Sequence, residues 1–266
     1  MMWVKVVCAL LVCCSLCGFA VADEGSASAA KVLAPSGRLR VAINFGNSVL
    51  AQKDPATGAP RGVSVDLARE LGRRLGVPVD LIPFDAAGKV TDALKSDAWD
   101  LAFLAVDPVR ANEITFSSPY VIIEGAYLVP AGSPLHTNED VDQAGNRVAV
   151  GRGSAYDLYL TRALKHAELI RVPTSPDAIT TFVQQKLEVA AGVKQPIVAY
   201  ANAHPDVRVI PGRFMVIEQG MGIPKAHAAG AAYVQAFIEE MKASGFVAKA
   251  LAASGQPDAV VAPPAK

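Results

Sequence analysis

The chain has 266 residues, of which 52% are hydrophobic and 19% charged, and its 25 basic residues balance its 25 acidic residues. A chain without net charge gives no electrostatic reason to expect nucleic acid or an anionic membrane surface as a partner. All four cysteines lie before residue 18, so the rest of the chain has neither disulfides nor cysteine-ligated metal. The remainder is long enough to bury a hydrophobic core without such cross-links.

The first 22 residues have the pattern of a secretory signal peptide. Lys5 is the only charge before an apolar run that ends in Ala20-Val21-Ala22. A basic start, an apolar stretch and an A-x-A site predict cleavage after Ala22. We therefore expect a periplasmic protein whose mature chain begins at Asp23.

Two alternatives remain for this segment. A membrane anchor needs ~20 apolar residues, whereas this run is slightly shorter and ends in small residues. A lipoprotein needs an acylated cysteine, but the residues before Cys17 form a poor lipobox, because the leucine and the small residues stand in the wrong order. No later apolar run approaches a membrane span, so we expect no stable membrane insertion of the mature chain.

Both ends of the mature chain lack periodic hydrophobicity. Residues 23–37 are rich in alanine and serine and predict a flexible linker. Residues 256–266 contain prolines at three positions and predict a disordered tail.

Between these ends, short apolar strands alternate with amphipathic helices. Ser64 is a candidate N-cap for the first helix, Gly76 ends that helix, and Asp107-Pro108 begins a later one. The βαβαβα order predicts a mainly parallel sheet with helices on its faces. The strands are expected at 39–43, 77–83 and 100–105, and the helices at 64–75, 89–95 and from 107 onward.

The same alternation begins again after residue 131. Extended connectors near 127–129 and 215–222 separate this second unit from the first, and an amphipathic helix at 228–244 follows them. The strands of the second unit are expected at 147–150, 169–172, 189–193 and 207–210, and its helices at 154–164, 174–185 and 196–203.

Three stretches resemble the family 3 extracellular solute-binding proteins, which serve polar amino acid ABC transporters. The first is GVSVDLA at 62–68, followed by LGV, and the weakest is VAVGRGS at 148–154. The most specific stretch runs from ALKS and WD at 93–100 through Arg110 to ITFSSPY at 114–120. The resemblance spans residues 39–255.

This resemblance implies an α/β, two-lobed type II periplasmic-binding fold, in which each lobe is a mainly parallel sheet flanked by helices and two crossover strands join the lobes. Lobe one would comprise residues 38–126 and 217–255, and lobe two residues 127–216. The resemblance also implies a small carboxylate-bearing ligand between the lobes, and ABC permease and ATPase subunits as partners. We expect no cofactor and a monomeric chain.

Arg110 is the principal candidate ligand contact. It follows a strand end and is expected at the start of a helix, where a guanidinium presents a planar fork to a carboxylate and the helix dipole adds to the attraction. In the resembled family, the matching arginine binds the α-carboxylate of the ligand. A surface ion pair with Glu113 or Asp107 is the alternative interpretation.

Gly153, Ser154 and Ala155 are expected to face Arg110 from lobe two. They open a helix, so their N–H groups and the Ser154 hydroxyl would form an anion cradle. Tyr156 either covers the ligand or packs in the core. The full set of candidate ligand-binding residues is Asn44, Phe45, Ala105, Asp107, Arg110, Gly153, Ser154, Ala155, Tyr156 and Lys194.

The sequence departs from the resembled family at several of these positions. Asn44 and Phe45 stand where the family often has an aromatic-rich stretch, and Asp107 where it commonly has threonine. Lys194 stands where the family has an aspartate that receives an α-ammonium, which a desolvated lysine would repel. If Lys194 faces the cleft rather than solvent, the pocket favours a dicarboxylate, a keto or hydroxy acid, or an acidic amino acid.

Other functions fit the sequence less well. An enzyme on the same fold, such as a cyclohexadienyl dehydratase-like lyase, needs a positioned acid or base, and the spacing of the glutamates singles out no pair. A soluble ligand-presenting partner of a sensor is a further alternative. The four histidines lack ligand spacing, so no metal site is expected.

Overall fold

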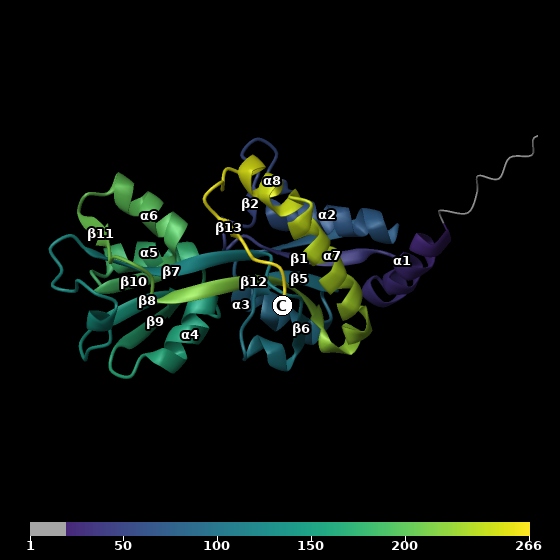
Figure 1. The fold of residues 1–266 in the computed structure, drawn as a ribbon. Coiled ribbons are helices and arrows are strands. Elements are labelled where there is room, and N and C mark those ends of the chain that lie inside the picture. The colour runs from purple at the N-terminus through teal and green to yellow at the C-terminus, as the bar shows by residue number, and fades with distance from the viewer. Residues whose placement is uncertain (1–19) are drawn as a thin grey trace, which may run out of the picture.

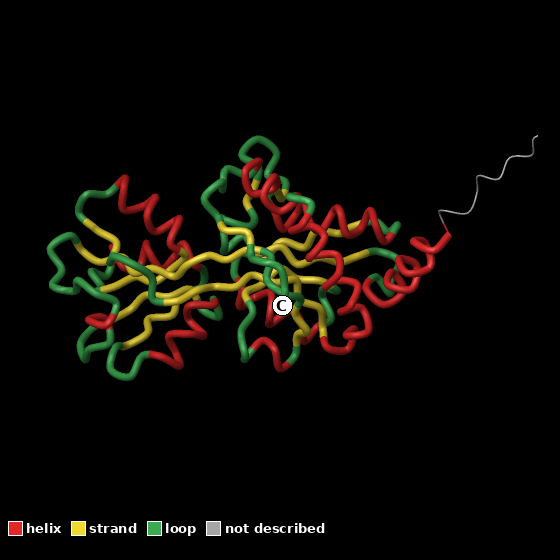
Figure 2. The backbone as a smooth tube through the Cα atoms, viewed as in Figure 1, coloured by secondary structure: helices red, strands yellow, loops and turns green. Residues whose placement is uncertain are grey.

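The computed structural model describes residues 20–266, in which eleven strands form one sheet in the order β4-β1-β5-β12-β7-β10-β8-β9, with β6, β11 and β13 attached to its long strands. β7 (Val121–Pro130) and β12 (Met215–Pro224) pair antiparallel and run between two lobes (Figure 1). Helices cover both faces of the sheet in each lobe (Figure 2). This arrangement confirms the predicted two-lobed α/β fold with two crossover strands.

Lobe one is built around three parallel strands, in which β1 pairs with both β4 and β5, as a βαβ order requires. Its strands are β1 (Leu39–Asn44), β4 (Val79–Phe84), β5 (Leu101–Ala105) and β6 (Ile114–Phe116), beside a small sheet of β2 (Gln52–Lys53) and β3 (Pro60–Arg61). Its helices are α1 (Ala20–Leu33), α2 (Val63–Leu75), α3 (Ala87–Ala93), α7 (Ala231–Ala243) and α8 (Phe246–Ala253). Its 3₁₀ helices are η1 (Leu94–Ser96), η2 (Arg110–Asn112) and η4 (Lys225–Gly230).

Lobe two repeats this construction with β8 parallel to both β9 and β10, while β10 and β11 pair antiparallel with β7. Its strands are β8 (Arg147–Gly151), β9 (Glu168–Val172), β10 (Val189–Val193) and β11 (Val207–Val209). Its helices are α4 (Ala155–Ala163), α5 (Ser175–Gln184), α6 (Lys194–Ala203) and the 3₁₀ helix η3 (Glu139–Val141).

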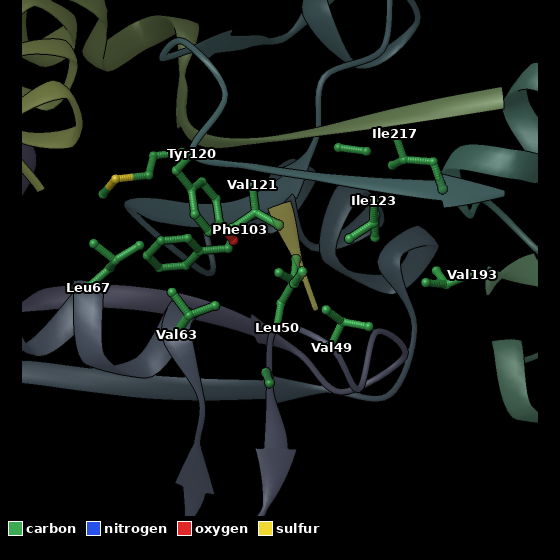
Figure 3. Packing of buried hydrophobic residues seen from close by; sticks show 14 of the residues in the cluster. Val49, Leu50, Val63, Leu67, Phe103, Tyr120, Val121, Ile123, Val193 and Ile217 are labelled. Atoms are coloured by element: carbon green, nitrogen blue, oxygen red, sulfur yellow. The ribbon is translucent and has the colours of Figure 1, made fainter. Parts of the chain in front are cut away.

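The ITFSSPY stretch forms part of the core of lobe one. Tyr120 is fully buried, its ring meets Phe103 edge-on at 5.8 Å between centroids, and its hydroxyl lies 3.2 Å from Ser64 Oγ. Ser64 is therefore a buried residue inside α2, and the N-cap position belongs to Gly62. The same hydrophobic core continues along β7 and β12 to Ile217 and Val193 at the junction of the lobes (Figure 3).

Both chain ends differ from the sequence prediction. The predicted linker is helical as far as Leu33, which is fully buried against Gly230 of η4. The predicted tail includes β13 (Val260–Val261), which pairs antiparallel with β7, and its Ala262 N–H donates to Tyr120 O. Neither segment has a periodic pattern of apolar residues, so the sequence alone gives no signal for a helix or strand there. Contacts with lobe one hold both segments in place. Residues 1–19, which hold most of the predicted signal peptide, lie outside the described residues. From residue 20 onward, no helix is long and apolar enough to cross a membrane.

Candidate ligand-binding site between the lobes

Arg110 lies just beyond the end of β5, where the two lobes meet. Its side chain is buried, with 5% of the residue exposed. Nη1 donates to Ala105 O at 2.9 Å in lobe one, and Nη2 donates to Gly153 O at 2.8 Å in lobe two. Nε is buried and has no hydrogen-bond partner among the described residues. The guanidinium thus links the lobes, and its Nε–H group has no partner among the described residues.

The environment of Arg110 suits an anion. Burial lowers its pKa to about 10, and the charge of Asp107 opposes that shift. The guanidinium is therefore protonated at neutral pH, with carbonyl dipoles as its direct partners. A buried charge is stabilised by a charged, hydrogen-bonded partner. A ligand carboxylate would therefore compensate for the hydration that the Arg110 guanidinium loses on burial.

The local structure around Arg110 differs from the expected helix start. Asp107 Oδ1 accepts from Val109 N at 2.8 Å, but only the short 3₁₀ helix η2 follows. Asp107 Oδ2 is engaged by Arg162 Nη2 of α4 at 2.8 Å. Because η2 is so short, the helix dipole expected to assist Arg110 is not supplied there. Asp107 instead forms an ion pair between the lobes.

The start of α4 supplies a carbonyl to Arg110 in place of the expected anion cradle. Gly153 N donates to Asp157 Oδ2 at 2.8 Å, and Ser154 N donates to Gly151 O. Ser154 Oγ caps α4 by accepting from Asp157 N at 3.0 Å. Two of the expected N–H donors are therefore already used within lobe two.

Two glycines bring the lobes into backbone contact beside Arg110. A Cβ on Gly88 of α3 would lie 2.8 Å from Arg152 O, and a Cβ on Gly153 would lie 2.7 Å from the Gly88 Cα. Contacts below 3.0 Å force a shift of one backbone. The observed approach of lobe one to lobe two thus requires a residue without a side chain at position 88.

Two adjoining cavities lie between the lobes. The first, the arginine cavity, has a volume of about 30 Å³ and is lined by Asn44, Gly46, Asn47, Ala87, Leu104, Ala105, Arg110, Ser154, Ala155, Tyr156, Ser175, Val193, Ile217 and Gln219. The second, the apolar cavity, has a volume of about 260 Å³ and is lined by Phe45, Gly46, Asn47, Ser48, Tyr156, Ser175, Pro176, Ile179, Thr180, Ala191, Gly192, Val193, Pro196, Ile197 and Tyr200. The two cavities share Gly46, Asn47, Tyr156, Ser175 and Val193, so they adjoin and together make up the candidate site.

The structure brings together most of the residues expected in the site. Six of them line the arginine cavity, namely Asn44, Ala105, Arg110, Ser154, Ala155 and Tyr156, and Phe45 lines the apolar cavity. Gly153 contacts Arg110 without lining either cavity, and Asp107 also lies outside both.

Lys194 does not line either cavity. It begins α6, and its Nζ lies 2.7 Å from Glu124 Oε2 on β7. Arg213 Nη1 contacts the other oxygen of that carboxylate at 2.6 Å. This three-residue cluster lines a third cavity of about 1040 Å³, which shares Ser48, Ile179, Pro196 and Tyr200 with the apolar cavity. That Lys194 faces the ligand therefore stays a prediction.

Sequence reasoning missed residues that line the site from α5 and α6. Ser175, Ile179, Ile197 and Tyr200 all face a cavity. Thr174 forms a capping box with Asp177 at the start of α5, and this T-x-x-D pattern after β9 marks a helix start at the carboxyl end of a parallel strand. Ligand contacts concentrate at such positions, so Ser175 could have been predicted from the sequence to line the site.

The pKa of Glu124 is held below its usual value of 4.5, first by its hydrogen bond to Lys194 and then by that to Arg213. A carboxylate with a lowered native pKa stabilises the fold above its unfolded pKa, and this stability is lost as pH falls through the native value. We expect Glu124→Gln to lower the free energy of unfolding at pH 7 by up to about 1 kcal/mol, because all three groups are partly exposed.

Urea denaturation of the wild-type and variant chains from pH 7 to pH 3 measures this contribution. The two free energies should converge as the pH falls below 4.5. Glu113→Gln, at an exposed position, is the control and should leave the pH dependence unchanged. A difference between wild type and Glu124→Gln that stays constant down to pH 3 would contradict the role given to the ion pairs.

Residues 20–266 contain no group of three or more His, Cys, Asp or Glu side chains that could hold a metal ion. The side chains that line the two cavities provide one buried guanidinium, several hydroxyls and amides, and an apolar extension. It can bind a small anion with an apolar part.

Solved structures with the same fold are numerous. The chain is similar to the solute receptor for L-cysteine of Neisseria gonorrhoeae, with a TM-score of 0.74 and 20% identity over 86% of this chain and 94% of that one. An amino acid ABC transporter substrate-binding protein AbpA from Streptococcus pneumoniae bound to L-arginine gives a TM-score of 0.73 and 19% identity over 85% and 98% of the chains. An ancestral amino acid-binding protein, a precursor of cyclohexadienyl dehydratase, gives 0.70 and 23% over 85% and 98%.

No curated protein matches this sequence. The model of the bacterial extracellular solute-binding proteins, family 3, matches residues 40–253. These residues include both lobes and Arg110. The chain therefore belongs to the bacterial extracellular solute-binding proteins of family 3.

Proposed function

We propose that this chain is a periplasmic solute-binding protein that encloses a small carboxylate-bearing ligand between its lobes and delivers it to an ABC permease. The observation that carries the proposal is the buried Arg110, which donates to a carbonyl of each lobe and keeps Nε unpartnered among the described residues. A carboxylate at this point would contact both lobes at once. Ligand binding would therefore favour the arrangement in which the lobes are in contact.

The size of the site agrees with a ligand as small as those named for the related structures. The two cavities together are at the low end of the range for small-molecule sites. The A-x-A site after an apolar run supports export, and the family supports a ligand-carrying role. The permease and ATPase subunits would be separate chains.

Catalysis is not favoured by the residues in the site. General acid–base chemistry needs a carboxylate, imidazole or comparable group within hydrogen-bond reach of the substrate. Among the described residues that line the two cavities there is neither an acidic side chain nor a histidine. Binding is the function that these side chains support.

Mass spectrometry of natively purified protein identifies the bound ligand and tests this proposal. A thermal-shift screen of carboxylates against their neutral carboxamides is the second test, because a ligand that binds only the folded state raises the melting temperature. We expect carboxylates to stabilise the protein and the matched carboxamides to have little effect. Equal stabilisation by both members of each pair, or by neither, would contradict a carboxylate-binding role.

A further inference from the structure

The charges around the two cavities are unequal. Among the described side chains that line either cavity, Arg110 is the only charged one. The nearby acids are engaged by other arginines, because Asp107 pairs with Arg162 and Asp157 pairs with Arg171 at 2.9 Å. A ligand carboxylate therefore has a charged partner in this site, whereas a ligand ammonium group has none.

The acceptors at the arginine cavity carry no charge to match an ammonium group, and three of them are already engaged. Asn44 Oδ1 accepts from Gly46 N at 2.9 Å, and the carbonyls of Ala105 and Gly153 accept from Arg110. Burying an ammonium group without a charged, hydrogen-bonded partner is costly. An α-amino acid would bury its carboxylate and its ammonium together, so this cost applies to every amino acid ligand.

The volumes of the two cavities indicate which part of the ligand each cavity could hold. The arginine cavity of about 30 Å³ holds a group the size of a carboxylate or a few waters. The rest of the ligand must occupy the apolar cavity of about 260 Å³, among Phe45, Ile179, Ile197 and Tyr200. A charged or strongly polar side chain on the ligand would lose its hydration there without compensation.

Tyr156 lies where the two parts of the ligand would join, because it lines both cavities. Its hydroxyl is near those of Ser154 and Ser175, but it forms no hydrogen bond of ordinary geometry with the described residues. Burial raises the pKa of this hydroxyl above its usual 10.0, so it remains a donor at neutral pH. An oxygen on the carbon next to the ligand carboxylate would accept from it.

We infer, on the basis of the proposed function, that the ligand is a 2-oxo or 2-hydroxy monocarboxylic acid with an apolar side chain. Arg110 binds the carboxylate, Tyr156 donates to the adjacent oxygen, and the apolar cavity holds the side chain. A second carboxylate inside these two cavities would have no cationic partner, because Lys194 lines the neighbouring cavity and is paired there with Glu124. The two cavities therefore favour a monocarboxylate over a dicarboxylate.

Calorimetry with matched ligands tests the inference on the intact protein after its own ligand has been dialysed away. One set is 4-methyl-2-oxopentanoate, 4-methylpentanoate and L-leucine, and the other is phenylpyruvate, 3-phenylpropanoate and L-phenylalanine. In at least one set the oxo acid should bind more than tenfold more tightly than the amino acid. The acid without the 2-oxygen should fall between them, and 2-oxoglutarate should bind more weakly than the oxo acid of that set.

Two variants separate the contacts. Tyr156→Phe should weaken binding of the oxo acid about five- to tenfold and leave the acid without the 2-oxygen unchanged, which a merely structural role would not do. Lys194→Ala should change neither affinity. Tighter binding of 2-oxoglutarate that is lost in Lys194→Ala would overturn the monocarboxylate assignment.

The failures of the two proposals are distinguishable. If the amino acid of each set binds as tightly as the oxo acid, the inference is overturned, while binding that still depends on Arg110 leaves the proposed function standing. If natively purified protein carries no carboxylate and none of the acids binds, the proposed function is overturned and the inference with it.

Discussion

Arg110→Gln is expected to weaken ligand binding by roughly a hundredfold or more. Truncating one partner of a buried, charge-assisted contact costs ~2–5 kcal/mol, and glutamine offers neither the positive charge nor the planar fork of a guanidinium. Calorimetry with the ligand found on the natively purified protein gives the change directly. The fold should survive the substitution, because the variant removes a buried cation whose direct partners are backbone carbonyls.

Two further variants control this result. Arg147→Gln removes a partly exposed arginine of lobe two that pairs with Glu188, and it should leave ligand affinity unchanged. Arg110→Lys keeps the charge without the fork and should give an intermediate loss. An affinity of Arg110→Gln within threefold of wild type, with the melting temperature preserved, would show that Arg110 does not contact the ligand.

The fold was predictable from the sequence because its signals are local. The alternation of strands and helices, the cap at Gly76 and the apolar runs of β1 and β5 each arise within a few residues. The position of Arg110 at the junction of the lobes was predictable for the same reason, since a residue just after a parallel strand lies at the carboxyl edge of the sheet.

The features that were not predictable depend on partners far away in the chain. Lys194 begins α6 two residues before the expected helix start, and an ion pair with Glu124, on a different element, holds its side chain outside the arginine and apolar cavities. Asp107 has the sequence of a helix cap, yet Arg162 of the other lobe engages its second oxygen. No local pattern encodes either pairing.

The role of Gly153 shows the same limit at the level of the backbone. A glycine and a serine before a helix indicate free N–H groups, but Asp157, which lies within the helix, accepts from Gly153 N. What faces Arg110 is the Gly153 carbonyl. Only the approach of the two lobes determines which backbone group of this residue is presented, and that approach depends on the small size of Gly88.

Gly88→Val is expected to weaken ligand binding at least tenfold while leaving lobe one folded. Gly88 lies in helix α3, where a Cβ meets no conflict with a helical backbone, so the substitution acts mainly across the lobe interface. There its Cβ would lie 2.8 Å from Arg152 O and 3.3 Å from the Gly153 Cα. The lobes must separate to admit it, which moves Gly153 and Tyr156 away from Arg110 and exposes the ligand carboxylate to water.

Gly88→Ala should have a smaller effect in the same direction, because its single methyl group forces a smaller separation. Gly132→Ala is the matched control, since a Cβ at that exposed position meets nothing within 4 Å, and it should bind ligand as wild type does. Calorimetry gives the affinities, and small-angle scattering with saturating ligand should give a larger radius of gyration for Gly88→Val than for wild type. If Gly88→Val binds with wild-type affinity and scatters like the wild-type complex, the ligand does not require the backbone contact between the lobes, and Arg110 must then reach the carboxylate from lobe one alone.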